Sequence, residues 1–194
     1  MAALDRTAQI VGCLLSHSGA VGHTRLLKLL YLADLESRRL RGRPISDLRY
    51  RFHHFGPFDA GIYTAVGELE RDGLVEERTI QHRGGKVERQ VVALGDLPRD
   101  AIDPVDEHIL AYVCRTYARL SLDDLLKIVY ETGPMKDAVR GRSISMEAEN
   151  NKDREEVGFD LERSIANYEA AERGDYMTGT DFFDALRAKI ASRG

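Results

Sequence analysis

Histidine and cysteine are the residues of this chain best suited to metal or nucleophilic chemistry, but their spacing favours neither. The six histidines show no zinc-type spacing with the two cysteines, and the His-Glu-x-x-His pattern is absent. His53 and His54 are adjacent, so on a strand their side chains would point to opposite faces and could not easily share one metal ion. We therefore expect no metal ion and no other cofactor.

Motifs for nucleophilic catalysis and phosphate transfer are also missing. There is no Gly-x-Ser-x-Gly elbow and no Walker-type loop. The run 83–86, Arg-Gly-Gly-Lys, could touch a phosphate, but a hairpin turn is the simpler interpretation. The acid-rich run 147–156 is typical of a solvated linker, which cannot hold two carboxylates at a fixed separation. These patterns predict a protein that is not an enzyme.

Length and composition indicate an ordinary globular protein of one domain or one and a half. The chain has 194 residues, of which 43% are hydrophobic and 31% charged, and its net charge is -4. It contains no apolar run long enough to cross a membrane and no visible signal peptide. Cys13 and Cys114 lie in apolar helical patterns and predict small core residues in a reducing compartment. We expect a cytoplasmic protein without a membrane partner.

The elements that must position any site are mostly helices. Apolar spacing predicts helices at about 4–17, 24–41, 59–72, from 104, from 121 to about 132, at 161–174 and from 180. The alternation of apolar and polar residues predicts a strand at 48–53, and the Gly-Gly pair predicts the turn of a β-hairpin at 74–94. The glycine and proline within 55–58 predict a turn there. The helix at 24–41 is apolar on too many sides for a surface helix, so it should lie in the middle of the fold.

This order predicts an α+β, mostly helical fold: a winged-helix-like core with a small β-hairpin and additional C-terminal helices. We expect three parts, a domain at 1–134, a polar linker at 135–158 and a helical tail at 159–194.

A winged-helix regulator would insert the helix at 59–72 into the DNA major groove and place Arg83 and Lys86 on phosphates. That helix ends with three acids against one arginine, which would repel DNA.

Three short motifs in order resemble a known family. They are the helix start at 24–31 (Thr-Arg-Leu-Leu-Lys-Leu-Leu-Tyr), Gly-Arg-Pro-Ile at 42–45, and Phe-Gly-Pro-Phe at 55–58 with Tyr63 after it. Together they resemble the Panacea domain of SocA-like antitoxins, over about residues 5–130. Phe58 departs from the family pattern, which usually has a small β-branched residue there. The resemblance implies an antitoxin that binds a cognate protein toxin encoded nearby.

The tail resembles more weakly the end of ParD-like antitoxins. Its amphipathic helix either docks in a partner groove or folds back onto the domain. Lys28, Tyr31 and the Gly-Pro turn also admit a purely structural interpretation. The partner-binding residues that the motifs and the tail imply are Lys28, Tyr31, Phe55, Gly56, Pro57, Tyr63, Phe182, Phe183, Leu186 and Ile190.

The leading hypothesis is therefore an antitoxin that neutralises a toxin by direct protein–protein contact. The alternatives are a winged-helix DNA-binding regulator and a phage-related adaptor protein. A homo-oligomer is left open, and nucleic acid is the less favoured partner.

Overall fold

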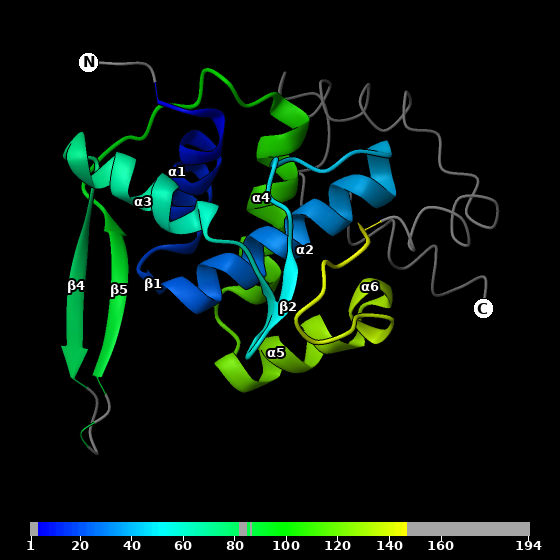
Figure 1. The fold of residues 1–194 in the computed structure, drawn as a ribbon. Helices are drawn as coiled ribbons and strands as arrows, with labels where there is room; N and C mark the ends of the chain where they lie inside the picture. Colours follow the sequence, from blue (N-terminus) through cyan, green and yellow to red (C-terminus); the bar gives the residue numbers. More distant parts are fainter. Residues whose placement is uncertain (1–3, 82–84, 86, 147–194) are drawn as a thin grey trace.

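The protein is seen in a computed structural model that describes residues 4–81, 85 and 87–146 (Figure 1). The tail at 159–194, the acid-rich run at 147–156, Arg83 and Lys86 lie outside the described residues. The described chain is α+β and mostly helical, which confirms the predicted fold class. No helix in this part of the chain is long and apolar enough to cross a membrane. The helices are α1 (Arg6–Ser18), α2 (His23–Arg41), α3 (Gly61–Arg71), α4 (Pro104–Tyr117), α5 (Leu122–Glu131) and α6 (Gly133–Lys136).

Helix α2 runs through the middle of the helical body, as its wide apolar pattern predicts (Figure 1). Its leucines pack against α1, α4 and α5, and it ends at Gly42, whose left-handed φ of 75° suits glycine. Side chains cap the start of two other helices. Asp103 caps α4 with Pro104 in its first turn, and the Ser121 hydroxyl accepts from the Asp124 amide at the start of α5.

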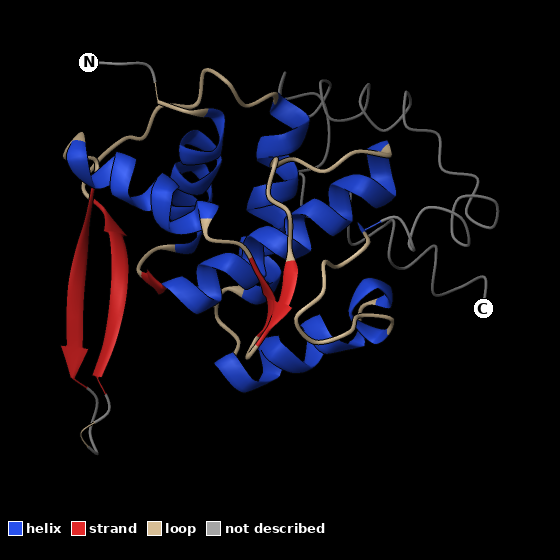
Figure 2. Cartoon of the chain, in the orientation of Figure 1, coloured by secondary structure: helices blue, strands red, loops and turns tan. Residues whose placement is uncertain are grey.

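A three-stranded antiparallel sheet stands at one side of the helices (Figure 2). The predicted hairpin is confirmed as β4 (Val75–Gln81) and β5 (Val87–Ala93), and β1 (Val21–Gly22) pairs with β5 to give the order β1-β5-β4. Two residues are too few to show alternation in the sequence, so β1 is not predicted. The element order agrees with a winged helix, which stays a prediction.

A second, two-stranded sheet lies against α2 and α5, and here the sequence analysis is wrong about one element. Residues 55–58 are predicted as a turn, but Gly56–Phe58 forms strand β3, which pairs with β2 (Arg51–His53). The turn that reverses the chain direction lies earlier than predicted, between His53 and Gly56, which pair with each other. Gly56 makes it tight, because its φ of 89° is accessible mainly to glycine.

Residues 135–146, the first part of the predicted linker, pack onto the domain. The side chains of Met135 and Ile144 are 3% and 6% exposed. Ser143 bridges to Arg51 antiparallel, so this segment lies beside β2 on the edge that β3 does not use. The packed body therefore extends past residue 134 to at least Ile144.

Candidate partner-binding site

Helix α2 buries three polar side chains, Lys28, Tyr31 and Asp34, and each one holds a different segment of the surface. The spacing of three residues places them on one side of the helix. All three side chains are at most 2% exposed. A buried polar group needs a hydrogen-bond partner, so each residue fixes whatever segment supplies that partner.

Lys28 holds strand β3. Its Nζ donates a hydrogen bond to the Pro57 carbonyl oxygen at 2.5 Å. Burial lowers the pKa of Lys28 from its ordinary 10.5 to about 8, because the ammonium has lost its water. Gly56 sits above the same side chain, and a Cβ there would lie 3.8 Å from Lys28 Cε. Lys28 thus holds Gly56 and Pro57, the residues that follow the turn, against helix α2.

Tyr31 holds the junction between α5 and α6. Its hydroxyl lies 2.8 Å from the Thr132 hydroxyl, which itself donates to the Val129 carbonyl oxygen. The hydrogen of the Thr132 hydroxyl is thereby used, so Tyr31 is the donor in this pair. The ring of Tyr31 also meets Tyr50 edge to face, with centroids 5.2 Å apart.

Asp34 holds the loop that leads into β2. One carboxylate oxygen accepts from the Ile45 and Ser46 amides, and the other accepts from the Ser46 hydroxyl at 2.5 Å and the Tyr50 hydroxyl at 2.6 Å. Burial raises the pKa of Asp34 to about 6, although these hydrogen bonds act in the opposite direction. Burial and the nearby Asp34 also raise the pKa of Tyr50.

The six predicted contact residues of the described chain therefore fall into two groups. Lys28, Tyr31, Gly56 and Pro57 are buried and offer no surface of their own. Phe55 and Tyr63, by contrast, are 62% and 49% exposed. Lys28, Tyr31 and Asp34 form a buried polar frame, and Gly56 and Pro57 belong to the segment after Phe55 that Lys28 holds. The four predicted tail residues are Phe182, Phe183, Leu186 and Ile190, and they lie outside the described residues.

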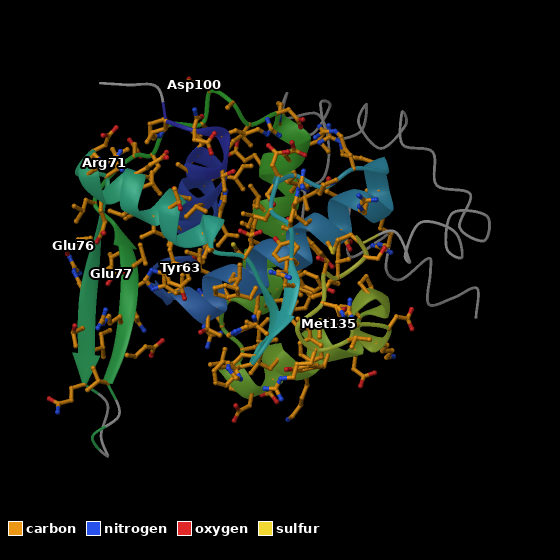
Figure 3. The ribbon with its side chains drawn as sticks, viewed as in Figure 1. Tyr63, Arg71, Glu76, Glu77, Asp100 and Met135 are labelled. Carbon is orange, nitrogen blue, oxygen red and sulfur yellow. The ribbon has the colours of Figure 1, made fainter. Side chains whose placement is uncertain are left out.

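Five neighbouring rings form an aromatic strip, defined here as His54, His53, Phe58, Tyr63 and His23 in that order. Successive ring centroids are 4.5, 5.2, 6.2 and 4.9 Å apart. The rings come from β2 and its turn, β3, α3 and α2, so the strip joins four elements. Figure 3 shows Tyr63 on the first turn of α3, beside the start of α2.

The two adjacent histidines lie closer together than their predicted placement on opposite faces of a strand suggests. Strand β2 ends at His53, so the chain turns before His54 and the two rings meet nearly at right angles. Alternation between faces holds only within a strand.

One group in the described part of the chain has the atoms to ligate a metal. Cys13, His17 and Glu107 place one ligand atom each within 4.8 Å of one another. Glu107 is already paired with the Arg99 guanidinium, and burial raises the pKa of the Cys13 thiol to about 12. A cation there would have to displace Arg99 and deprotonate a buried thiol, so the fit is poor.

Sequence reasoning missed Asp34 and the strip. A signal for Asp34 existed, since it continues the spacing of Lys28 and Tyr31 on a helix whose other central residues are apolar. No local signal marks the strip, because its rings come from separate elements.

The fold and site together define an α+β domain in which a buried polar frame holds segments that carry exposed aromatic side chains. The family model described as "Antitoxin SocA-like, Panacea domain" matches residues 26–134, which is more than half of the chain. The chain therefore belongs to the SocA-like antitoxin family, as its three motifs predict. No curated protein and no solved structure matches it.

Proposed function

We propose that this protein is an antitoxin that neutralises a cognate toxin by direct protein–protein contact and performs no catalysis. The observation that carries the proposal is the family match over residues 26–134, the part of the chain that contains the frame and the turn. We place the protein in the cytoplasm, in keeping with its two buried free cysteines.

The exposed aromatic residues support a binding role. Phe55 and Tyr63 are 62% and 49% exposed, although aromatic side chains of this size usually lie in the interior. Aromatic residues are enriched among the contacts that dominate protein interfaces. The hydrogen bond from Lys28 to Pro57 holds the strand after Phe55, which lowers the entropy lost when a partner binds.

Co-expression with the product of the adjacent gene tests the proposal. We expect that product to arrest growth alone and the full chain to restore growth. Phe55→Ala with Tyr63→Ala should weaken the rescue, whereas Leu94→Ala, which truncates an exposed apolar residue elsewhere, should retain it. An adjacent product that is harmless, or one that remains toxic beside the intact chain, contradicts the proposal.

A DNA-binding regulator is the second candidate. It is favoured by the order of three helices, α1, α2 and α3, followed by the β4–β5 hairpin, with which β1 pairs, because this is the order of a winged-helix domain. Against it, Glu68, Glu70 and Asp72 outnumber Arg71 at the end of α3. A gel shift with the upstream DNA of the gene would distinguish the two, since a complex that survives moderate salt would favour the regulator.

A further inference from the structure

Arginines without carboxylate partners border the aromatic strip. Within the described residues, Arg49 and Arg51 are exposed and take part in no ion pair. Arg140 donates to His54 Nδ1 at 2.9 Å, a contact that leaves its charge uncompensated. Other exposed arginines of the described residues, such as Arg71 and Arg119, also take part in no ion pair, so what distinguishes this group is that Arg51 and Arg140 lie directly beside rings of the strip. The end of the strip formed by His54, His53 and Phe58 therefore has cationic side chains beside it on a chain whose net charge is -4, and the nearby Asp59 carboxylate is taken up by the backbone amides of Arg49 and Gly61.

Strand geometry brings this charge onto the same face as the rings. Arg51 and His53 share the outer face of β2, because side chains alternate along a strand. Arg51 lies directly opposite Phe58 of β3, so its guanidinium starts beside a ring of the strip. On the other side of β2, Arg51 is bridged to Ser143, whereas Arg142 lies opposite Phe52 and so belongs to the other face. Arg51 beside Phe58 and Arg140 beside His54 thus place two cations at the strip.

We propose that the toxin docks on the aromatic strip through an acidic surface that also carries apolar side chains. This inference rests on the proposed function and specifies the partner chemistry of the same site. Carboxylates of the partner would pair with the uncompensated Arg49 and Arg51, while its apolar side chains would cover Tyr63 and Phe55. Charge complementarity of this kind steers association and selects the partner.

The ring geometry favours a protein over single-stranded nucleic acid. Nucleic acid bases stack on successive aromatic faces. The planes of neighbouring rings in the strip are inclined by 79°, 36°, 45° and 18°, so they do not present a run of parallel faces.

The test measures binding of the full chain to the purified product of the adjacent gene. Arg49→Glu with Arg51→Glu should weaken binding by at least about tenfold and should flatten its dependence on salt. The control, Arg71→Glu with Arg119→Glu, makes the same change in net charge at two exposed arginines, one at the end of α3 and one between α4 and α5, and should bind as the wild type does. Tyr63→Ala should weaken binding but keep the salt dependence, and Tyr63→Phe should restore the affinity.

Each other result overturns the inference in a recognisable way. Wild-type rescue of growth together with unaltered binding by the strip variants would leave the antitoxin function intact and remove this docking surface. Equal losses of affinity in the Arg49/Arg51 variant and in the control variant would show that the effect depends only on the net charge of the protein. Tight binding of a single-stranded oligothymidylate that depends on the same arginines would assign the strip to nucleic acid. A wild-type chain that binds no adjacent product would remove the proposed function and the docking surface together.

Discussion

Single residues of the buried frame determine how the turn is held, and Lys28 gives the clearest pH signature. Its pKa falls from 10.5 in the unfolded chain to about 8 in the fold. Between these values the unfolded chain binds the proton that the folded chain has lost, so the contribution of Lys28 to stability rises with pH. The difference in unfolding free energy between wild type and Lys28→Met should increase by about 3 kcal/mol from pH 8 to 10.5.

Urea denaturation at several pH values measures this difference. Lys136→Met, at an exposed lysine, serves as the control and should follow the wild-type curve. A difference between wild type and Lys28→Met that stays constant with pH would show that the buried amine does not titrate with folding.

Asp34 should contribute strongly to the stability of the fold, because four hydrogen-bond donors converge on its carboxylate. Asp34→Ala leaves the Ile45 and Ser46 amides and two hydroxyls without their acceptor, which should lower the free energy of unfolding by about 3 kcal/mol. Asp34→Asn keeps an oxygen for both amides, and its amino group can donate to the hydroxyls, so it should cost less. Equal losses in the two variants, measured by urea denaturation, would contradict this account.

At the scale of elements, we expect replacement of glycine by alanine to have opposite effects on stability at two positions. Gly56→Ala places a side chain at a φ of 89°, which should destabilise the protein by about 1 kcal/mol or more even though the nearest atom is 3.6 Å from the new Cβ. Gly67 lies within α3 with open space around it, so Gly67→Ala should stabilise by about 0.5–1 kcal/mol. Thermal denaturation measures both, and shifts of the same sign would refute the conformational explanation.

The elements themselves differ in how well the sequence predicts them. Pro104 in the first turn of α4, the Ser121 cap and the Gly-Gly hairpin depend on nearby residues, so their signals are local. Strand β3 is only three residues long and contains Gly56 and Pro57, which locally favour a turn. It becomes a strand because β2 pairs with it and Lys28 binds its carbonyl.

At the scale of the whole molecule, an arginine–aspartate network ties α1, α2 and α4 together. The buried carboxylate of Asp106 pairs with Arg6 at 3.1 Å and with Arg41, which also pairs with the α4 cap Asp103 at 2.9 Å. Asp106→Ala leaves these guanidinium groups without a buried partner and should lower the free energy of unfolding by about 3 kcal/mol.

Glu131→Ala removes a carboxylate from an exposed ion pair with Lys136 and should leave stability unchanged. Comparison of the two variants by urea denaturation separates the network from a general loss of acidic charge. A loss of similar size in both variants would show that the network adds nothing specific.

The sequence by itself determined the helical body, the central place of α2 and the family, because apolar periodicity, caps and short motifs are local patterns. It also singled out Lys28, Tyr31 and Phe55. The tertiary structure decided their roles: it buried Lys28 and Tyr31 as supports and left Phe55 exposed. It alone brought His53, Phe58 and Tyr63 into one strip, since contact between side chains of separate elements depends on how those elements pack and not on any spacing along the chain.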